Sequence, residues 1–592
     1  MDINRQLKEE IEQVVTTLLG QSVDNLQIQP TNPEFEGSHT LVCFPLTKTS
    51  RKSPEETAKM IGEHLVANSK MVVRYNAVKG FLNLVLADAT WVDAFRAIFQ
   101  NKNFGEVPSH GREIMVEYSS PNTNKPLHLG HLRNNFLGWS VSEIYKALGY
   151  TVHKVQIIND RGIHICKSMA AWMLSGKDET PESTGLKGDK LVGKYYVEFD
   201  KIYKAQVHEL ITAGRTKEAA EREAPIMQLA VDMLRKWEQK DTDTVELWKM
   251  MNGWVYKGFD STYHQMGVEF DKLYYESETY LLGKEEVLKG LKQGVFFKKD
   301  DGSVWVDLTA DGLDQKVLLR ADGTSVYMTQ DIGTAILRFR DFPKISKQVY
   351  TVGNEQEYHF KVLFLILAKL GYSWAKECYH LSYGMVDLPT GKMKSREGTV
   401  VDADDLMHEM IGEAETQTRE LGKIEEMDSE EAKRLFEMIG LGALKFFLLK
   451  VDPKKRMMFD PNESIQLQGH TGPFIQYTHA RIRAILRKAE SLGHVPAVGK
   501  ISELLAAEKE LIQLLNAYPS RVEEAARNYS PALVANFAFD LAKTYNQFYQ
   551  AIPIFGEPDN DKLKFRVALS KTVAETIGKS MHLLGIKVPE RM

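Results

Sequence analysis

The sequence predicts a multidomain α/β protein in which a parallel-sheet domain, interrupted by a helical insertion, is flanked by a small α+β domain and an all-α bundle. At 592 residues the chain is too long for one hydrophobic core. Between about residues 113 and 371, apolar strand-like segments are each followed by a helical pattern, which is typical of a parallel sheet with crossover helices. From Ser429 onward nearly every segment has the period of an amphipathic helix.

Residues 1–106 are predicted to form the α+β domain. Apolar residues first recur on one helical face and end at a glycine suited to a helix C-cap: Leu7, Ile11, Val14, Leu18, Leu19 and Gly20. Three strand-like segments follow, with helical patterns between them: LVCFPL, MVVRYNAV and GFLNLVL. The next segment, FGEVPSHGR, has the glycine and proline content of a linker.

Residues 107–385 are predicted to form the parallel-sheet domain. Its strand-like segments are EIMVEY, VHKVQII and KQVYTVG, and helical patterns such as HLRNNFLGWSVSEIYKALG and HFKVLFLILAKLG follow them. Long, charged, helix-forming segments interrupt this alternation at about 168–266, which we interpret as an insertion. Two further strand-like segments, VWVDL and KVLLR, are expected to return the chain to the sheet. Residues 386–450 then form a connecting region, and the all-α bundle is predicted at 451–592.

Composition limits the partners and the compartment. With a net charge of −5 and a pI near 6.4, any nucleic acid must be held by local patches rather than by overall attraction. Cys43, Cys166 and Cys378 are too far apart for a zinc site of the usual spacing, so we expect no bound structural metal and a reducing compartment. The N-terminus is charged, and the longest apolar run, 362–368, is too short to span a bilayer. We therefore expect a soluble cytoplasmic protein without membrane contact.

Two histidines lie where a predicted strand leads into a helix, within SSPNTNKPLHLGHLRNN (residues 119–135). This places them at the carboxyl edge of the parallel sheet, where such folds bind ligands, and at a helix N-terminus, which favours anions. Gly130 would let a flat ring lie against the backbone, and His128 and His131 could donate hydrogen bonds to phosphate oxygens. Such a histidine is, by itself, commonly a cap or a surface residue, but the strand, the helix and the preceding Pro-Asn-x-x-Lys-Pro together favour a functional site.

This segment resembles the first signature of class I aminoacyl-tRNA synthetases, and PNTNKPLHLGH is similar to the arginyl-tRNA synthetase form. Further segments resemble the same family, in the same order along the chain: VEYSSPN, NDRGIHICKSM, ESETY, LLRADGTSVYMTQDIGTA, GKMKSREGTVV, HTGPFIQYTHARIRAIL and LLGIKVPERM. The resemblance implies a Rossmann-type catalytic domain, an N-terminal additional domain that contacts the tRNA elbow, and a C-terminal anticodon-binding bundle.

The resemblance also implies a reaction in two steps. Arginine attacks the α-phosphate of ATP to give arginyl-adenylate and pyrophosphate, and a terminal ribose hydroxyl of arginine tRNA then takes the arginyl group. Such chemistry depends mainly on positioning and on neutralising charge on phosphate oxygens, which is the role implied for His128 and His131. The expected partners of a monomeric enzyme are L-arginine, ATP with Mg²⁺, and tRNA. The residues that the resemblance assigns to ATP are Pro121, Gly130, Gly353, Met385 and Val386.

The second class I signature carries a lysine, and GKMKSREG (residues 391–398) resembles it imperfectly. In the general pattern, Lys-Met-Ser-Lys-Ser, the second lysine would fall at Ser395, whereas this chain has Lys394 one place earlier. Arginyl enzymes commonly compensate with a lysine ahead of the histidine motif, and Lys125 occupies that place. The sequence leaves open whether Lys125, Lys392 or Lys394 makes the main phosphate contact.

A pocket for arginine needs carboxylates and planar acceptors, because the guanidinium stays protonated and presents a rigid fork of donors. The family resemblance carries this role onto five positions: Glu117, Asn122, Tyr327, Asp331 and Gln356. Tyr327 and Asp331 are four residues apart and would share one face of a helix. A carboxylate such as Glu117 or Asp331, taken alone, is more commonly a solvent-exposed or capping residue.

Aromatic side chains are the candidates for contact with tRNA, because unpaired bases stack on aromatic faces. The family resemblance favours residues near the D-loop and in the anticodon-binding bundle: Phe81 and Asn83, and Phe474, Tyr477, Tyr549 and Met592, respectively. An aromatic residue at helical spacing is, however, commonly part of a core.

Two other functions compete with an arginine–tRNA ligase. A cysteinyl member of class I would need zinc-binding cysteines, which this chain lacks. A catalytically inactive relative that only binds RNA is disfavoured because His128, Gly130, His131 and Asp331 are intact. A single-turnover adenylation assay would separate an active enzyme from such a scaffold.

Overall fold

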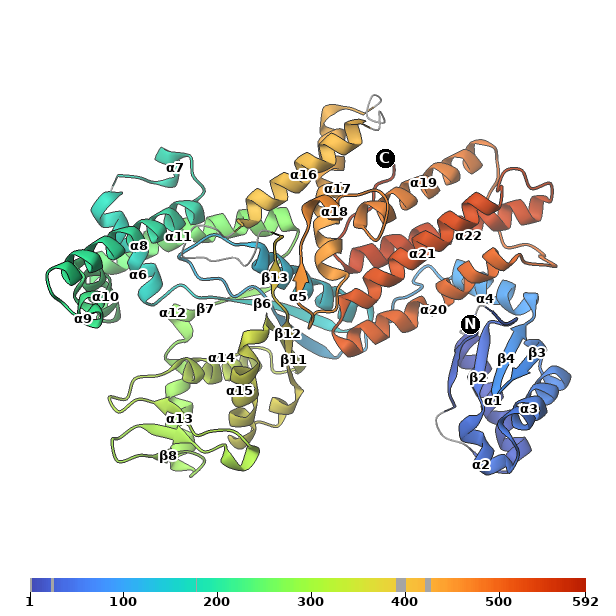
Figure 1. Cartoon of the computed structure of the whole chain (residues 1–592), viewed down its shortest axis with the longest axis horizontal. Helices are drawn as coiled ribbons and strands as arrows, with labels where there is room; N and C mark the ends of the chain where they lie inside the picture. The colour runs from blue at the N-terminus through green and yellow to red at the C-terminus, as the bar shows by residue number, and fades with distance from the viewer. Residues whose placement is uncertain (1–2, 23–25, 33, 177, 390–400, 421–426) are drawn as a thin grey trace.

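The structure is a computed structural model, and it describes residues 3–22, 26–32, 34–176, 178–389, 401–420 and 427–592. Figure 1 shows the helical insertion at one end of the long axis, the parallel sheet near the middle, and the N-terminal domain at the other end, below the C-terminal helices. The predicted multidomain α/β architecture is confirmed.

The N-terminal domain contains α1 (Ile3–Leu19), β1 (Ile28–Pro30), β2 (His39–Val42), α2 (Thr47–Ser50), α3 (Pro54–Asn68), β3 (Val72–Val78), β4 (Phe81–Leu86) and α4 (Asp88–Gln100). Its antiparallel sheet has the order β1-β2-β4-β3. As predicted, α1 buries one apolar face, and Gly20 follows it with a φ of 71°. The strand predicted at 41–46 is wrong in its second half, because Phe44–Leu46 form a 3-10 helix and Pro45 has no N–H to donate to a sheet.

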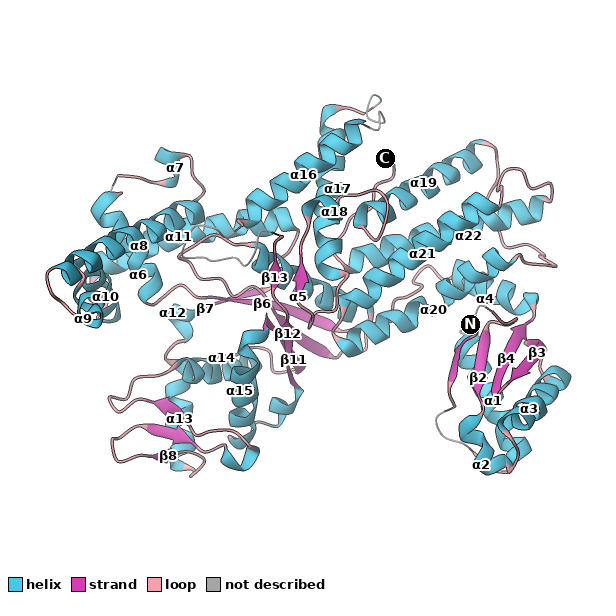
Figure 2. Ribbon diagram, in the orientation of Figure 1, coloured by secondary structure: helices cyan, strands magenta, loops and turns pink. Residues whose placement is uncertain are grey.

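The central domain is built on five parallel strands: β5 (Glu113–Glu117), β6 (Thr151–Ile158), β7 (Lys272–Tyr275), β11 (Ile345–Gly353) and β12 (Cys378–Tyr383). Their order is β12-β11-β5-β6-β7, and Figure 2 shows them in magenta near the centre of the molecule. The helices α5 (Leu129–Ala147) and α15 (Glu357–Lys369) follow β5 and β11. Because the strand order changes direction between β5 and β11, the carboxyl ends of these two strands form a switch point, where such sheets bind ligands.

The helical insertion follows β6. It comprises α6 (Ile163–Ser175), α7 (Pro181–Thr184), α8 (Gly188–Thr212), α9 (Lys217–Glu223), α10 (Pro225–Glu238) and α11 (Thr242–Met266). Apolar side chains of α6, α8 and α11 are buried together in the main hydrophobic core, among them Met169, Leu191 and Val255. Gly267, with a φ of 69°, ends the last helix, and the chain then enters β7.

The segments VWVDL and KVLLR do not return the chain to the parallel sheet, and that prediction is wrong. They contain β9 (Val304–Val306) and β10 (Lys316–Leu319), which pair with β8 (Phe297–Lys298) in a separate antiparallel sheet. With α13 (Leu282–Lys292), α14 (Tyr327–Asp341) and α15 this sheet forms an apolar core separate from the main one. The strand that returns to the parallel sheet is β7, followed directly by α12 (Glu276–Thr279).

The predicted all-α character of the C-terminal region is confirmed. Its helices are α17 (Ser429–Leu449), α18 (Pro461–Ser464), α19 (Gly472–Ser491), α20 (Ala506–Asn528), α21 (Pro531–Ala551) and α22 (Asn560–Leu583). The connecting region contributes α16 (Ala403–Glu420) and the short strand β13 (Val386–Asp387), which pairs with β14 (Met457–Met458). Within the described ranges, none of the helices combines the length and apolar character that a membrane span requires.

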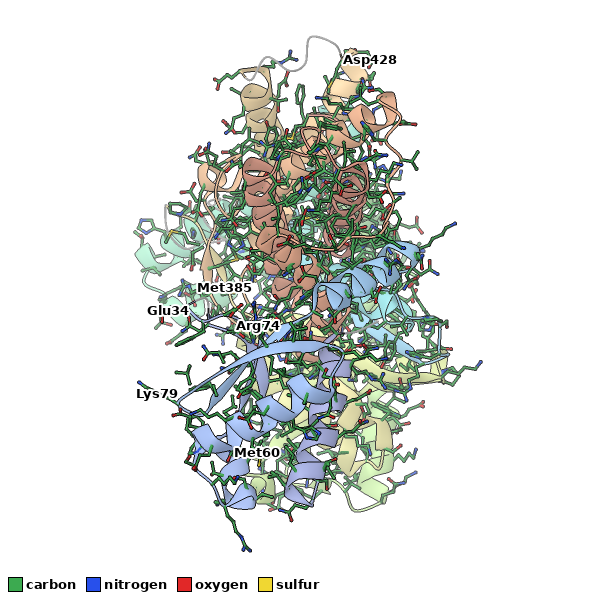
Figure 3. The ribbon with its side chains drawn as sticks, turned by 90° about the vertical axis from the view of Figure 1, so that its right-hand side faces the viewer. Glu34, Met60, Arg74, Lys79, Met385 and Asp428 are labelled. Atoms are coloured by element: carbon green, nitrogen blue, oxygen red, sulfur yellow. The ribbon has the colours of Figure 1, made fainter. Side chains whose placement is uncertain are left out.

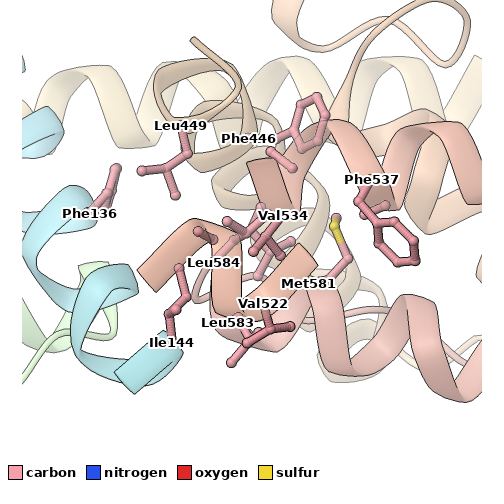
Figure 4. Packing of buried hydrophobic residues seen from close by; sticks show 14 of the residues in the cluster. Phe136, Ile144, Phe446, Leu449, Val522, Val534, Phe537, Met581, Leu583 and Leu584 are labelled. Carbon is pink, nitrogen blue, oxygen red and sulfur yellow. The ribbon is translucent and has the colours of Figure 1, made fainter. Parts of the chain in front are cut away.

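Helix α5 joins the parallel-sheet domain to the C-terminal helices. Figure 4 shows Phe136 and Ile144 of α5 beside apolar residues such as Leu449 and Leu584. Within this core the hydroxyl of Ser140 donates a hydrogen bond of 2.7 Å to the carbonyl of Leu583. The helix that begins at the two histidines is therefore anchored in the bundle along its length.

The N-terminal domain also contacts the C-terminal helices. The carboxylate of Asp88 pairs with Lys509 at 2.6 Å and accepts a hydrogen bond from the backbone N–H of Leu504 at 2.8 Å. The rings of Phe95 and Phe565 pack edge to face, with centroids 5.3 Å apart. Figure 3 looks onto this domain from its outer side, with Lys79 at its margin.

Candidate active site

The two histidines cap the first turn of α5. His128 is the N-cap residue, and its Nδ1 accepts a hydrogen bond of 3.1 Å from the backbone N–H of Gly130. In turn, Nδ1 of His131 accepts a hydrogen bond of 3.1 Å from the backbone N–H of His128. Because a backbone N–H can only donate, both Nδ1 atoms are unprotonated acceptors and each ring carries its proton on Nε2. The pair thus keeps two Nε2–H donors at a helix N-terminus.

Both imidazoles are neutral near pH 7. Burial, followed by the charge of Lys125, lowers the pKa of His128 to about 3. Burial is also the main cause that lowers the pKa of His131 well below its ordinary value, with smaller contributions from His128 and Lys125. Burial likewise lowers the pKa of Lys125. An anion entering this site would therefore meet neutral Nε2–H donors and a half-buried ammonium group with little competition from water.

The segment around the histidines is held from two sides. The side chain of Asn134 accepts a hydrogen bond of 2.6 Å from the backbone N–H of Ser119 and donates one of 2.7 Å to the carbonyl of Thr351, so it ties the end of β5 to β11. Ser119 adopts a φ of 59°, a left-handed conformation that is uncommon outside glycine. On the other side, the backbone N–H of Leu129 donates to the carbonyl of Val401 at 3.2 Å.

The residues expected to bind ATP come from the carboxyl ends of three neighbouring strands. Pro121 follows β5 and is buried, Gly130 is in the first turn of α5, and Gly353 is the last residue of β11. Met385 and Val386 follow β12; Met385 is 46% exposed, whereas Val386 is buried. The sheet order thus brings these five positions to one edge, beside the two histidines.

A cavity of about 820 Å³ lies next to this edge. It is lined by residues that follow β5 and β6, by α10 and α12, and by the start of α14, including Asn122, Arg161, Glu276, Tyr327 and Asp331. Three of the five positions expected to bind arginine are therefore in one cavity.

Tyr327 and Asp331 share one face of α14, as their spacing predicts, and both line the cavity. Tyr327 is 77% exposed, so its ring is open to a ligand. The carboxylate of Asp331 interacts with Nε2 of His359 at 2.6 Å. This contact orients the carboxylate while leaving its side chain 41% exposed.

Glu117 and Gln356 are outside the group that lines the cavity. The carboxylate of Glu117 is buried and forms an ion pair with the buried guanidinium of Arg338. Burial is the main cause that raises the pKa of Glu117, and Arg338 opposes this shift. Gln356 lies in a 3-10 turn after β11 and is exposed. In this structure the guanidinium of Arg338 therefore takes the place beside the carboxylate of Glu117 that the guanidinium of a bound arginine would need.

Glu276 is a carboxylate of the cavity that the sequence reasoning missed. Its pKa is raised to about 7, mainly by burial and also by Asp160 and Asp331, while Arg161 opposes the shift. Arg161 also lines the cavity, but it is paired with Glu238 at 3.0 Å and its guanidinium stacks 4.0 Å from the ring of Tyr280. The segment ESETY is visible in the sequence, yet no periodicity indicates which of its acids faces a cavity.

Of the three candidate lysines, the structure describes Lys125 alone; Lys392 and Lys394 lie outside the described residues. Lys125 is half-buried, three residues before His128. Among the described side chains, no group of three or more histidines, cysteines or acids is arranged to hold a metal ion.

Of the pair expected near the D-loop, only Phe81 presents its side chain to solvent. Phe81 is 37% exposed and packs edge to face against Phe44, which is 45% exposed. Asn83 is 2% exposed and accepts a hydrogen bond of 2.6 Å from the hydroxyl of Thr40. Its burial leaves the amide no open face for RNA, so the expectation of direct contact is not supported at that position.

In the C-terminal bundle the guanidinium of Arg481 lies between two of the expected aromatic residues, 4.9 Å from the ring of Tyr477 and 5.7 Å from that of Tyr549. Tyr549 is 40% exposed. Phe474 and Met592 are partly buried and pack against the main core. The bundle therefore carries an aromatic and cationic surface on α19 and α21.

Comparisons with known families agree with these three regions. Residues 95–460 match the family described as tRNA synthetases class I (R), catalytic domain. Residues 475–592 match the DALR anticodon binding domain, and residues 2–86 match the arginyl tRNA synthetase N terminal domain.

Individual relatives match along the whole chain. An arginine–tRNA ligase of Amoebophilus asiaticus is 56% identical over 599 residues, with 100% of both chains covered, and one of Bacteroides fragilis is 57% identical over 581 residues, with 97% of each covered. The solved structure of Thermus thermophilus arginyl-tRNA synthetase matches with a TM-score of 0.78 and 25% identity over 100% of both chains. That of Plasmodium falciparum arginyl-tRNA synthetase, at 18% identity, matches in fold with a TM-score of 0.76, covering 100% of this chain and 99% of that one. The chain therefore belongs to the arginyl-tRNA synthetase family of class I tRNA synthetases.

Proposed function

We propose that the chain is an arginine–tRNA ligase, which activates L-arginine with ATP and transfers it to the terminal ribose of arginine tRNA for protein synthesis. The observation that carries this assignment is the pair of neutral Nε2–H donors at the N-terminus of α5 beside a cavity that contains Asp331 and Glu276. Formation of arginyl-adenylate requires hydrogen-bond donors to the phosphate and hydrogen-bond acceptors for the guanidinium, and this site contains both kinds of group.

In the first step, a carboxylate oxygen of arginine attacks the α-phosphorus of ATP and the bond to pyrophosphate breaks. Charge moves onto the phosphate oxygens, and the Nε2–H groups of His128 and His131 donate to them. Preorganised donors in a site from which water is largely excluded stabilise such charge effectively. Both imidazoles are neutral and each Nδ1 already accepts a backbone N–H. Since the attacking carboxylate has no proton to lose, the histidines act as hydrogen-bond donors and not as bases.

The guanidinium of arginine is recognised in the cavity. Asn122, Tyr327 and Asp331 line it, and Glu276 adds a second carboxylate. A cation beside Glu276 favours its ionised form, so arginine would convert a carboxyl group with a pKa of about 7 into a charged partner. The family resemblance also assigns Glu117 and Gln356 to arginine; neither lines the cavity, and Glu117 is paired with Arg338.

ATP would enter as its Mg²⁺ complex, and the metal would add to the neutralisation of charge on the phosphate oxygens. Pro121, Gly130, Gly353, Met385 and Val386 surround the nucleotide at the carboxyl edge of the sheet. Lys125 contacts its phosphates, with Lys392 and Lys394 as the other candidates. The half-buried location of Lys125, close to the histidines, supports this order.

Transfer RNA contacts both outer domains. The domain limits we propose are 1–106 for the elbow-contacting domain, 107–385 for the catalytic domain with its insertion at about 168–266, 386–450 for the connecting region, and 451–592 for the anticodon-binding bundle. Phe81, Tyr477 and Tyr549 are the exposed or partly exposed aromatic residues available for stacking. The enzyme acts as a monomer in the cytoplasm.

Arginine-dependent exchange of pyrophosphate into ATP tests this proposal. Exchange is expected with arginine, ATP and tRNA together, and close to background without tRNA, because arginyl enzymes complete the activation site with tRNA. Strong exchange with arginine and ATP alone would refute the tRNA requirement, and the absence of exchange under all conditions would refute the activity.

A further inference from the structure

Helix α8 of the insertion lies directly against the segment that carries the phosphate-binding residues. At Gly193 an added Cβ would lie 2.8 Å from Cδ of Pro126 and 3.6 Å from Cα of Lys125. A side chain at this position would therefore push on the backbone just before the two histidines. Helix α8 of the insertion therefore packs against the backbone at Lys125 and Pro126, just before the two histidines.

The N-terminal end of α8 makes a second contact, through the ammonium group of Lys187. This group pairs with the carboxylate of Asp404, donates a hydrogen bond of 2.5 Å to the hydroxyl of Thr262 on α11, and lies 3.3 Å from Oδ2 of Asp189. Thr262 in turn donates to Oδ1 of Asp404 at 2.8 Å. Asp189 and Asp404 are both buried. Three elements, α8, α11 and α16, are therefore joined by one buried polar network.

Asp404 belongs to a segment that pairs with the backbone of the histidine motif. The N–H of Leu129 donates to the carbonyl of Val401 at 3.2 Å, and the N–H of Ala403 donates to the carbonyl of Leu127 at 2.9 Å. Between these bonds, His128 and Asp402 form an antiparallel bridge. The backbone of His128 is thus held by residues 401–403. These are held in turn by α8, through Lys187 to Asp404 and through the more exposed Lys190 to Asp402 at 3.4 Å and Asp405 at 2.7 Å.

We propose that Lys187 is a positioning residue for arginine activation. By pairing with Asp404 it holds residues 401–403 against the histidine segment, and this fixes the backbone from which the Nε2–H donor of His128 projects. Lys187 itself touches neither substrate. The inference rests on the proposed function, because it assigns Lys187 to the phosphate step of that reaction.

The network could instead serve stability alone, and the two roles predict different results. A purely structural pair, when broken, lowers the melting temperature but leaves the turnover of the folded enzyme unchanged. A positioning pair lowers kcat, because displacement of a catalytic group by about 1 Å costs about a hundredfold in rate. The Michaelis constant for arginine should hardly change, since the guanidinium cavity lies apart from this network.

The test compares Lys187→Met with Lys204→Met in the charging of bulk tRNA with arginine. Lys204 is on the same helix and pairs with Asp200 at 2.6 Å, but it has no contact with residues 401–404. We expect kcat of Lys187→Met to fall about 10- to 100-fold, with the Michaelis constant for arginine within about twofold of wild type, and Lys204→Met to behave as wild type. An unchanged kcat in Lys187→Met, or an equal loss in both variants, would overturn the proposal.

Thr262→Val provides a variant that keeps the ion pair and nearly the same shape. It removes the hydroxyl that donates to Asp404 and accepts from Lys187, and should lower kcat by about five- to 25-fold, because each net hydrogen bond represents about a factor of five. Full activity of Thr262→Val together with failure of Lys187→Met to fold would show that the network is structural and would overturn the proposal.

Hydrogen exchange gives a readout that does not depend on activity. In Lys187→Met the amides of Leu129 and Ala403 should lose protection while those of the N-terminal sheet keep it. Uniform loss across the chain would indicate a folding defect and contradict the positioning role. If the wild-type chain fails to charge tRNA with arginine, the proposed function falls, whereas local loss of protection would still establish the physical link from Lys187 to the histidine segment.

Discussion

Replacing His131 with asparagine separates two roles of its imidazole. Nδ1 accepts the backbone N–H of His128 at 3.1 Å, whereas Nε2–H is the donor available to a phosphate. The Oδ1 of asparagine, like Nδ1 of histidine, is bonded directly to Cγ, so it can accept the same backbone N–H. His131→Asn therefore keeps the cap of α5 and removes only the Nε2 donor.

The expected size of the effect follows from this geometry. Removing one hydrogen-bond donor that stabilises developing negative charge lowers kcat by about 10²- to 10³-fold, equivalent to about 2.7–4 kcal/mol. Stability should change little in His131→Asn because the capping hydrogen bond survives. His131→Ala should lose the same rate and about 1–3 kcal/mol of stability as well, because it leaves the N–H of His128 without its partner.

Single-turnover charging with arginine, measured beside urea unfolding, distinguishes these outcomes. His208→Asn is the matched control, since His208 is an exposed histidine on α8. If His131→Asn keeps its rate within about tenfold of wild type at unchanged stability, far less than one lost donor should cost, His131 does not donate to the transferring phosphate and our account of the site is wrong.

Four further predictions concern the charges of the site. Lys125→Ala should reduce the rate of activation more than Lys394→Ala does in pre-steady-state measurements, and the reverse order would show that the shifted lysine has taken over. Asp331→Asn should raise the Michaelis constant for arginine by about 10- to 100-fold, since it weakens a charge-assisted hydrogen bond worth about 1.5–3 kcal/mol at a partly exposed carboxylate. The Michaelis constant for ATP should not change, and a parallel rise in both constants would refute the assignment. Glu117→Gln should mainly lower stability, by up to about 3–5 kcal/mol, because it leaves a buried arginine without its charged partner; unchanged urea unfolding would contradict this. The Michaelis constant for arginine should rise as pH falls below about 7, where Glu276 takes up a proton that a bound cation disfavours; a pH profile that Glu276→Gln leaves unaltered would count against this.

Much of the fold could be predicted because the central strands are apolar runs that lead into helices. β5, β6 and β11 were recognisable for this reason. β7 was missed because it has four residues, only one of them fully buried. The strands β9 and β10 can be predicted as strands, but their sheet cannot, since a strand pattern does not specify its partner strand, which depends on packing and turn geometry.

The residues of the site also fall into those that the sequence could predict and those that it could not. His128, Gly130 and His131 were predictable because their geometry is local to one helix start. Tyr327 and Asp331 were predictable as a pair because helical spacing places them on one face. The ion pair of Glu117 could not be predicted, because its partner comes from the far end of α14, and the raised pKa of Glu276 depends on burial by several distant elements.

The central claim is that this chain selects arginine and joins it to tRNA. Its most direct test is to charge bulk tRNA with each of the twenty amino acids in turn, using ATP and the purified chain. Our account predicts an ester with arginine alone, and its loss in His131→Asn. Charging with another amino acid at a comparable rate, or no ester with arginine, would contradict it.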